Sequence, residues 1–558
     1  MRDTAKLLLL SGAVVLGSCA TARTDAVTPI VGTDDAFASE AIYFLLTDRF
    51  VDGDPTNNHP DQGCPQHCTF DRPLPGPDGR SANVGYLGGD LQGALNHADY
   101  IAAMGFTSVW TTPVLDNPDA AFTGGDRVTF GSFGDGGKTG YHGYWANNFF
   151  KADEHLVSDD LDVATFITRL RDEHGLGYVF DLVGNHGSPA YSMPVAQPEY
   201  GKVYGRNGEV LADHMNLHPS ELSDDEPLHN WFNRTTGLAQ LMDFDPDNEA
   251  LLDYLVESYE YWLDQGVRAV RVDTHKEQPH RFWKKVSDRL RAKRPDLFMF
   301  GESYSFDADF IAEHTRPENG AYSVLDFPGR ESMTRVFENP DSDYADILDY
   351  LHLENGLYAN PYELVTFIDN HDMARMNASD EGFINAFNWL FTSRGIPAVY
   401  YGSEVNFMTG TKEHAGNRNY FGAERIAAAA GHPVHATVTR MANLRKRLPA
   451  LQRGVQVNAD FGGDTASFYR VLRTENEEQV LLVLLNKSGT AMGLPVSDTL
   501  HAGRWQDVET GEVAQTGQGE PRADVSVPAH GVRIFELVGK LGMSDLEARA
   551  AAGSRVSG

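Results

Sequence analysis

Short apolar runs alternate with longer stretches of helical spacing along most of the chain. Compact apolar runs predict buried strands, and apolar residues three and four positions apart predict amphipathic helices. The strand candidates are residues 41–46, 106–110, 177–180, 267–272, 297–300, 322–327, 364–368 and 396–401. The helix candidates are residues 91–104, 161–174, 251–264, 279–293, 330–337 and 382–392. Strands separated by helices favour a parallel sheet, so we predict an α/β fold, a closed (β/α)8 TIM barrel.

Two regions break this alternation. Residues 187–242 are irregular, rich in Pro, Asn and His, and too long for a simple connection, which indicates a small inserted domain after the third strand. Near the C-terminus, strict alternation of apolar and polar residues predicts an antiparallel β-sandwich domain. The predicted domains are the barrel (40–186 and 243–450), the inserted domain (187–242), the C-terminal β domain (451–540) and a frayed tail (541–558).

The first nineteen residues have the pattern of an export signal. Two basic residues precede the apolar segment 7–16, which is too short to span a membrane. Leu16–Cys19 resembles a bacterial lipoprotein processing site, which implies lipidation of Cys19; an ordinary secretory signal is the alternative. Residues 20–39 lack periodicity and predict a tether. We expect an exported protein, secreted or anchored by lipid at the cell surface or outer membrane, with no transmembrane span.

The formal net charge of -33 narrows the range of partners. Nucleic acids and anionic membranes would be repelled by such a surface. A neutral sugar polymer would not be repelled. The acidity has a simpler interpretation as well, because a charged surface also serves solubility or adaptation to salt.

Opposite charges mark the end of the strand candidate at 267–272. Side chains alternate along a strand, so Arg271 and Asp273 point to the same side, and the guanidinium keeps the carboxylate ionised. Taken alone, such a pair is more often structural than catalytic.

Ionisable residues also follow other strand candidates. Glu302 and Asp372 are carboxylates at strand ends, and His186 and His371 stand at neighbouring exits. If the barrel closes, these side chains and Asp273 converge on one mouth, the face at which TIM barrels carry their active sites. Glycosidic cleavage needs an ionised carboxylate to attack the sugar and a protonated one for the leaving oxygen.

The loop after the first strand carries short oxygen side chains. Asp52, Asp54, Asn57 and Asn58 could surround a hard cation, which prefers several oxygen ligands. The same composition is typical of a solvated turn.

Cys64 and Cys68 follow this loop. In an oxidising compartment a local disulfide is the default expectation. A zinc site with His59 and His67 is the weaker alternative, because no second ligand pair follows at the usual spacing.

Four segments together resemble the signature regions of the α-amylase family (glycoside hydrolase family 13), which contains retaining enzymes that act on α-glucans, including α-amylases and cyclodextrin glucanotransferases. These segments are Asp181–His186, Arg271–Lys276, Gly301–Glu302 and Phe367–Asp372. Ile42–Phe50 and Tyr141–Trp145 resemble further family segments. The resemblance runs from about residue 40 to 540.

The resemblance implies a role for each matching residue. Asp273 matches the nucleophile, Glu302 the general acid/base, and Asp372 the third carboxylate, which binds the ring hydroxyls of the reacting sugar. The implied substrate-binding residues are Tyr144, His186, Arg271, Lys276, Tyr304, His371 and Arg418. The segment before Arg418, residues 412–418, departs from the family pattern of an acidic residue shortly before the arginine.

The resemblance also implies two Ca2+ ions. The first would lie among Asp52, Asp54, Asn57, Asn58, Gly88 and Asp90. The second would be held by Asn185, Asp243 and the backbone of Glu277. In similar proteins a disulfide lies where Cys64 and Cys68 stand.

The specificity prediction depends on one residue and on domain content. Cyclodextrin-forming relatives carry a large aromatic residue four positions before the residue matching Asp243, where this chain has Ala239. They also carry starch-binding domains after the β domain, and cyclodextrin-hydrolysing relatives carry an added N-terminal domain; we expect neither here. We therefore predict a monomeric hydrolase of internal α-1,4 bonds in starch and maltodextrins, with some transglycosylation assisted by Tyr304. The alternatives are a cyclodextrin glucanotransferase, a cyclomaltodextrinase-like enzyme and a non-catalytic glucan-binding protein.

Overall fold

The computed structural model describes residues 28–496, 500–517 and 523–555 and is built around an eight-stranded parallel sheet. Its strand order is β14-β13-β12-β7-β4-β1-β16-β15, and a parallel bridge from Leu325 to Val365 joins the two outer strands. The predicted closed barrel is therefore confirmed. Its strands are β1 (Ile42–Leu45), β4 (Ser108–Thr111), β7 (Gly177–Leu182), β12 (Ala269–Val272), β13 (Phe298–Gly301), β14 (Ser323–Val324), β15 (Val365–Phe367) and β16 (Ile396–Tyr400).

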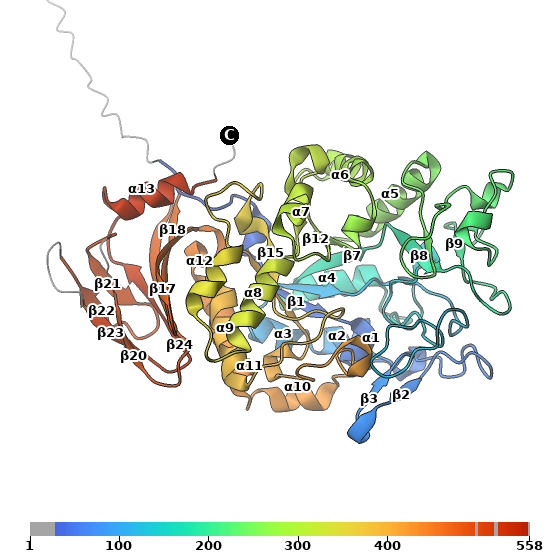
Figure 1. Ribbon diagram of the computed structural model, residues 1–558, viewed down its shortest axis with the longest axis horizontal. Helices are drawn as coiled ribbons and strands as arrows, with labels where there is room; N and C mark the ends of the chain where they lie inside the picture. Colours follow the sequence, from blue (N-terminus) through green and yellow to red (C-terminus); the bar gives the residue numbers. More distant parts are fainter. Residues whose placement is uncertain (1–27, 497–499, 518–522, 556–558) are drawn as a thin grey trace, which may run out of the picture.

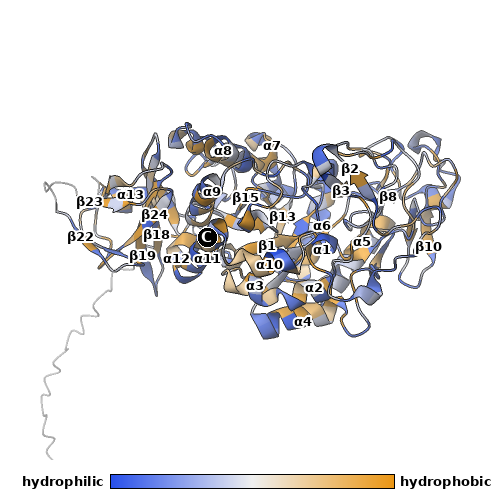
Figure 2. Cartoon of the chain, turned by 90° about the horizontal axis from the view of Figure 1, so that it is seen from below, coloured by the Kyte–Doolittle hydropathy of each residue, from blue (hydrophilic) through white to orange (hydrophobic). Residues whose placement is uncertain are grey.

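The barrel strands are buried on both faces, which explains why their sequences are continuous apolar runs. Within the barrel the rings of Phe44 and Trp110 stack with centroids 3.8 Å apart. Figure 2 shows hydrophobic colours along these strands, whereas outer helices such as α4 carry both kinds of residue.

Helices surround the barrel. Asp162, Asn248 and Ser379 accept backbone N–H groups at the first turns of three of them, so capping side chains set where these helices begin. The helices are α1 (Thr47–Phe50), α2 (Leu91–Asn96), α3 (Ala98–Ala103), α4 (Val163–His174), α5 (Glu249–Leu263), α6 (His280–Lys293), α7 (Ala308–Ala312), α8 (Phe327–Phe337), α9 (Asp380–Thr392), α10 (Ala423–Ala429), α11 (Pro433–Arg447), α12 (Pro449–Arg453) and α13 (Asp545–Ala552).

Two predicted elements differ from the structure. The helix expected over 91–104 is divided into α2 and α3 at His97, whose backbone leaves the helical region (φ -115°, ψ 14°). The strand expected over 322–327 is only two residues long, because Asp326 caps α8 and turns the chain into that helix at Phe327.

The inserted region follows β7. Its strands β8 (His186–Pro189) and β11 (Leu241–Asp243) pair antiparallel and bring the chain back toward the barrel. A second sheet has the order β10-β9-β6-β5. Its strands are β5 (Leu115–Asp116), β6 (Asn148–Ala152), β9 (Lys202–Tyr204) and β10 (Val210–Asp213). Residues before β7 thus contribute to the same sheet as the insertion. The hairpin β2 (Pro73–Pro75) and β3 (Ser81–Asn83) is separate.

The C-terminal region is antiparallel, as predicted. A six-stranded sheet has the order β17-β18-β19-β24-β21-β22, and β20 pairs with β23. In Figure 1 this sheet lies on one side of the barrel and the inserted region lies at the other. Its strands are β17 (Val455–Gly462), β18 (Thr465–Arg473), β19 (Glu478–Asn486), β20 (Met492–Pro495), β21 (Arg504–Asp507), β22 (Val513–Gln515), β23 (Asp524–Val527) and β24 (Gly531–Leu537).

The expected tether and frayed tail are both wrong over the residues that the structure describes. Ile30 is 1% exposed and exchanges two backbone hydrogen bonds with Arg473, each 2.8 Å long. In the tail, Leu546 on α13 is fully buried, and Arg473 binds Glu547 at 2.8 Å. Ile30 and α13 pack on the β domain, and Phe37 stacks on Phe298 of the barrel with ring centroids 4.6 Å apart, so contacts with distant segments order both ends of the chain.

The predictions for the signal (1–19), for Cys19 and for the first part of the tether lie outside the described residues. Across the described ranges, none of the helices has the length and apolar character required to cross a bilayer.

Candidate active site

A cavity of about 370 Å³ lies at the carboxyl ends of the barrel strands. It brings together the three carboxylates that the sequence selected, Asp273, Glu302 and Asp372. The predicted substrate-binding residues that line it are Tyr144, His186, Lys276, Tyr304, His371 and Arg418. Arg271 is fully buried beneath them.

Arg271, on β12, contacts three carboxylates. Its Nη1 lies 2.7 Å from Asp181 Oδ1 and 2.8 Å from Asp273 Oδ1, and its Nη2 lies 2.8 Å from Glu302 Oε2. β12 lies between β7 and β13, so the residues at the ends of these strands meet around one guanidinium. The Arg271 side chain therefore sets the positions of Asp273 and Glu302 relative to each other.

Glu302 and Asp372 differ in their affinity for a proton. Burial raises the pKa of Glu302 to about 8, and the charges of Asp372 and Asp273 add to this effect against the opposing attraction of Arg271. Burial also opposes the charge on Asp372, but His371 and Arg418 outweigh it and lower the pKa of Asp372 below its usual range. The cavity thus holds a protonated carboxyl group beside an ionised one at neutral pH.

Asp372 is held from two sides. Arg418 Nη2 lies 2.6 Å from Asp372 Oδ1, and His371 Nε2 lies 3.2 Å from Asp372 Oδ2. The His371 ring also stacks on Tyr144, with centroids 5.2 Å apart and planes within 5°. These contacts present a flat aromatic surface and a fixed carboxylate to the cavity.

His186 and Tyr144 border the Asp273 side of the cavity. His186 Nε2 lies 3.8 Å from Asp273 Oδ2, and burial lowers the pKa of His186, so the ring is neutral. The Tyr144 hydroxyl donates to Asp181 Oδ2 at 2.9 Å.

Lys276 and Tyr304 line the cavity together with Glu302. Lys276 Nζ donates to the backbone carbonyl of Tyr304 at 3.1 Å. The Tyr304 ring is 39% exposed at the rim of the cavity.

The family model "Alpha amylase, catalytic domain" matches residues 44–432. This chain belongs to the α-amylase family.

Similar proteins within the family carry two activities by name. A cyclomaltodextrin glucanotransferase of Thermoanaerobacterium thermosulfurigenes is 29% identical over 531 residues, which cover 91% of this chain and 68% of the relative. An α-amylase of Niallia circulans is 27% identical over 513 residues, 90% of both chains. Against a cyclomaltodextrin glucanotransferase of Bacillus licheniformis (30% identity over 432 residues), the chain spans only 55% of the relative's length.

A solved structure agrees over almost its whole length. It is a cyclomaltodextrin glucanotransferase described as the first with a three-domain ABC distribution; it has a TM-score of 0.72 and 27% identity, and the match covers 90% of this chain and 99% of that one. A three-domain chain is therefore found among cyclodextrin-forming members, so the expected lack of extra domains does not separate the two activities.

Two important residues of this α-amylase family site were not selected from the sequence. Asp181, fully buried at the end of β7, binds Arg271 and accepts from Trp110 Nε1 at 3.0 Å. It opens a family segment that the sequence did single out, but only the structure shows its partner. Glu413 is the second, and its Oε1 lies 2.8 Å from Arg418 Nη1. The altered segment 412–418 thus supplies an acidic partner for this arginine after all.

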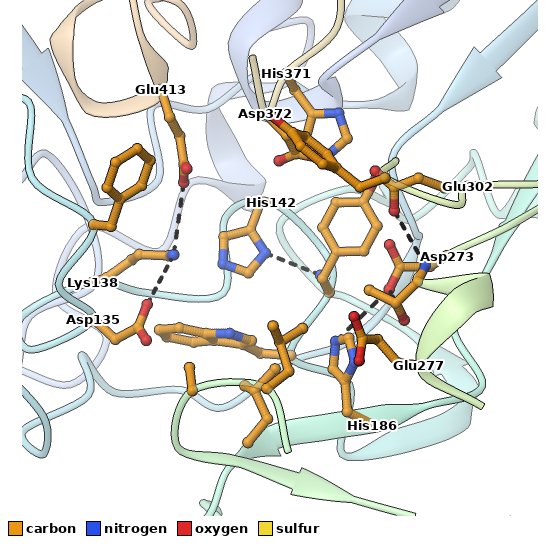
Figure 3. A pocket seen from close by; sticks show the side chains of 18 of the residues that line it. Asp135, Lys138, His142, His186, Asp273, Glu277, Glu302, His371, Asp372 and Glu413 are labelled. Atoms are coloured by element: carbon orange, nitrogen blue, oxygen red, sulfur yellow. Dashed lines mark hydrogen bonds and ion pairs between the residues drawn. The ribbon is translucent and has the colours of Figure 1, made fainter. Parts of the chain in front are cut away.

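Glu413 also reaches a second loop. Lys138 Nζ lies 3.9 Å from Glu413 Oε1 and 3.1 Å from Asp135 Oδ1. Figure 3 shows these three side chains on one side of the cavity, across from Asp273 and Glu302. The wall across from Asp273 and Glu302 is therefore built from two loops joined by charges.

The loop with the predicted first cation site contains unsatisfied oxygens. Within the described residues, Asp52 Oδ1, Asn57 Oδ1 and Asn58 Oδ1 are buried without a hydrogen-bond partner. A Cβ at Gly88 would lie 2.4 Å from Asn58 Oδ1, so only glycine permits this close approach. Oxygen atoms of this kind fit a hard cation. Asp90 and Asp54 mainly organise the loop instead, since Asp90 accepts from the N–H groups of residues 53, 54 and 93, and Asp54 accepts from Thr56.

The second predicted cation site lies where the inserted region leaves the barrel. Asn185 Nδ2 donates to Asp243 Oδ1 at 3.2 Å, and Asp243 Oδ2 accepts from Leu238 N at 3.1 Å. Among the described residues no group of three His, Cys, Asp or Glu side chains is placed to hold a metal. A cation at either place would therefore need amide or backbone oxygens as well, and the hard, oxygen-rich donors present suit Ca2+.

Cys64 and Cys68 form a disulfide, with an S–S distance of 2.07 Å. The predicted disulfide is confirmed. The zinc alternative is wrong, because both sulfur atoms are used in this bond.

Proposed function

We propose that this member of the α-amylase family is a retaining hydrolase that cleaves internal α-1,4-glucosidic bonds of starch and maltodextrins and releases maltooligosaccharides. Family membership supports a glucan-active glycoside hydrolase or transglycosylase. One observation carries the mechanism: Arg271 holds Asp273 and Glu302 at one cavity, and burial raises the pKa of Glu302 to about 8.

In the first step, Asp273 attacks the anomeric carbon of the sugar on the donor side. Glu302 gives its proton to the glycosidic oxygen, and the bond between the two sugars breaks. This leaves a glycosyl group on Asp273 and an ionised Glu302. Arg271 contacts both carboxylates, so it stabilises the charge as it moves from one to the other.

In the second step, a water molecule takes the place of the departed sugar. Glu302 removes a proton from this water, whose oxygen attacks the anomeric carbon and releases Asp273. Both protonation states are then restored, and the new sugar end keeps the α configuration.

The remaining residues would hold the reacting sugar. We assign ring hydroxyls to Asp372, His186 and His371, and the sugar face to Tyr144, in line with their places around the cavity. Arg418 keeps Asp372 in position at 2.6 Å. We assign Lys276 and Tyr304 to the acceptor side.

Cyclodextrin formation is the second candidate, and the named relatives favour it. Ala239 favours hydrolysis, because it lines the cavity with a methyl group where an aromatic ring would be needed to curl the glucan chain. The cyclomaltodextrinase-like and non-catalytic alternatives have no specific observation in their favour.

We also propose that two Ca2+ ions stabilise the fold. Asp52, Asn57 and Asn58 would hold the first; Asn185, Asp243 and the backbone of Glu277 would hold the second. A bound cation would compensate the buried oxygens of these loops. Export, lipidation of Cys19 and a monomeric state remain predictions from the sequence; the mass of the mature N-terminus tests the lipid.

Two experiments test the proposal. Product sizing during digestion of starch, pullulan, cyclodextrin and maltose should show linear maltooligosaccharides from starch, and mainly cyclic products would establish the second candidate. The D273N variant should lose activity by on the order of 10³-fold or more. Full hydrolysis by D273N would contradict the catalytic assignment.

A further inference from the structure

Two exposed aromatic side chains line the cavity, and two more follow one of them in the chain. In the part of the chain that the structure describes, the aromatic residues among the exposed large apolar side chains are Phe133, Tyr304, Phe306 and Phe310. Phe133 and Tyr304 line the cavity. Phe306 and Phe310 follow Tyr304 in the chain but lie outside the cavity lining. Exposing such rings costs free energy, so the two that contact each other, Tyr304 and Phe306, indicate a binding surface.

Tyr304 and Phe306 form one continuous aromatic surface. Their ring centroids are 6.0 Å apart, with planes at 80°. Both rings pack on Phe327, at 5.0 Å for Tyr304 and 6.1 Å for Phe306. Phe327 is fully buried, so it supports the two partly exposed rings from below. Tyr304 and Phe306 are each 39% exposed, which leaves part of each ring free for a ligand.

The segment that carries the rings is held in place before any ligand binds. Lys276 donates to the Tyr304 carbonyl at 3.1 Å. Three residues further on, Asp307 accepts from the N–H groups of residues 309 and 310 and caps α7. Ser305 Oγ accepts from the N–H of Asp307 at 3.2 Å. Because the backbone is ordered already, a ligand would lose little affinity to the ordering of this loop.

The position of this surface indicates its ligand. Tyr304 is at the cavity rim, two residues after Glu302, and Phe306 contacts Tyr304 from outside the cavity lining. A glucan chain that leaves the cavity on the acceptor side would pass over these rings. Sugar units offer flat C–H faces, which pack well on aromatic rings, and they carry no charge that the acidic protein would repel.

We propose that Phe306 extends the acceptor-side surface of Tyr304 beyond the cavity and forms a distal platform for a glucose unit of an α-1,4-glucan that lies further along the chain than those within the cavity. The inference rests on the proposed function and extends it, because it makes the length of the chain beyond the cleaved bond a determinant of substrate choice. Long maltooligosaccharides reach Phe306, whereas short ones end before it. Phe306 is thus a specificity-determining residue rather than a catalytic one.

Phe310 provides a matched control. It is 45% exposed and lies on the same segment. Its ring packs on His314, with centroids 5.7 Å apart, and not on Phe327, which supports Tyr304 and Phe306. If Phe306 served only to pack the loop, its removal would lower stability and affect all substrates alike. The platform predicts an effect that depends on chain length.

The experiment compares wild-type enzyme with F306A, F306W and F310A on maltotriose and on maltooctaose. For F306A we expect kcat/KM to fall about tenfold on maltooctaose through KM, the range expected for losing part of one buried aromatic face, and to change less than twofold on maltotriose. F306W should restore the activity on maltooctaose, and F310A should match the wild type.

An equal effect of F306A on both substrates, no effect on either, or the same effect from F310A would overturn the platform. Thermal unfolding of each variant separates loss of stability from loss of binding. If wild-type enzyme cleaves neither substrate, the proposed function fails instead, so the two failures are distinguishable.

Discussion

Arg271 contacts Glu302 directly, with 2.8 Å between Nη2 and Oε2, while its other terminal nitrogen holds Asp273. The sequence linked this arginine only to Asp273. One buried cation therefore faces three carboxyl groups, since Asp181 is also 2.7 Å away. A single positive charge cannot balance three negative ones, and this is a physical reason for Glu302 to retain a proton.

We expect a pH profile set on the alkaline side by Glu302. Its pKa of about 8 means that the acid form is lost as pH rises through that value, so kcat/KM should fall above about pH 8. The E302Q variant should lose at least about 10³-fold of the activity on starch. Its residual rate should lack the alkaline limb; a limb that persists at the same pH would belong to another group.

Glu302 should also affect stability, with a defined sign. The native state keeps a proton that the unfolded chain releases near pH 4.5, so this group destabilises the fold progressively as pH rises from about 4.5 to about 8. The melting temperature of E302Q should therefore exceed that of the wild type at pH 8 but not at pH 4. A difference in melting temperature that does not change with pH would argue against the raised pKa.

Asp181 should act as a positioning residue. D181N keeps the shape but removes the charge that faces Arg271, so the guanidinium would shift toward Asp273 and Glu302. We expect kcat to fall about tenfold or more, since charge-assisted contacts are the stronger hydrogen bonds, with little change in KM. The alkaline limb of the pH profile should move, because Arg271 would then favour the ionised form of Glu302. An unchanged pH profile would indicate a purely structural role.

Glu413 should support the binding of sugar on the donor side. E413Q leaves Arg418 and Lys138 buried without this shared carboxylate, and burying a cation without its partner is costly. We expect KM for starch to rise about tenfold as Arg418 loses its position beside Asp372. The control is D135N, because Asp135 contacts Lys138 but has no ion pair with Arg418. Equal effects of the two variants would assign the result to Lys138.

Removal of calcium should lower stability. A cation at a hundred times its dissociation constant contributes about 2.7 kcal/mol, so chelation should lower the melting temperature of the wild-type enzyme. We expect about two bound Ca2+ per chain by elemental analysis, in keeping with the two oxygen-rich loops. The D52A/N58A variant should bind one ion fewer. A variant with unchanged stoichiometry would exclude the first site.

Ala239 should control the ratio of linear to cyclic products. A239Y would place an aromatic ring in the cavity, around which a glucan chain could curl. Ala239 already holds a Cβ atom at φ 51°, and the tyrosine ring would be attached beyond that atom, so the backbone should tolerate the change. We expect a larger cyclic fraction in product sizing. L238Y, at a neighbouring cavity residue, is the control; an equal rise from L238Y would show that the position is not specific.

The sequence was sufficient for the barrel and for the three carboxylates. Buried parallel strands need continuous apolar runs, and the end of each run marks the face on which a polar residue can stand. The same reasoning placed Arg271 beside Asp273, because side chains alternate along a strand. Local rules of this kind depend only on neighbours in the chain.

Only the tertiary structure decided which distant residues meet. Arg271 reaches Asp181 and Glu302 because β12 lies between β7 and β13, and Glu413 reaches Lys138 because two long loops fold against each other. The burial that raises the pKa of Glu302 likewise arises from packing between segments far apart in sequence, and so do the contacts that order residues 28–39 and α13 against the barrel and the β domain. Such contacts depend on the arrangement of whole elements, and no local pattern of residues encodes that arrangement.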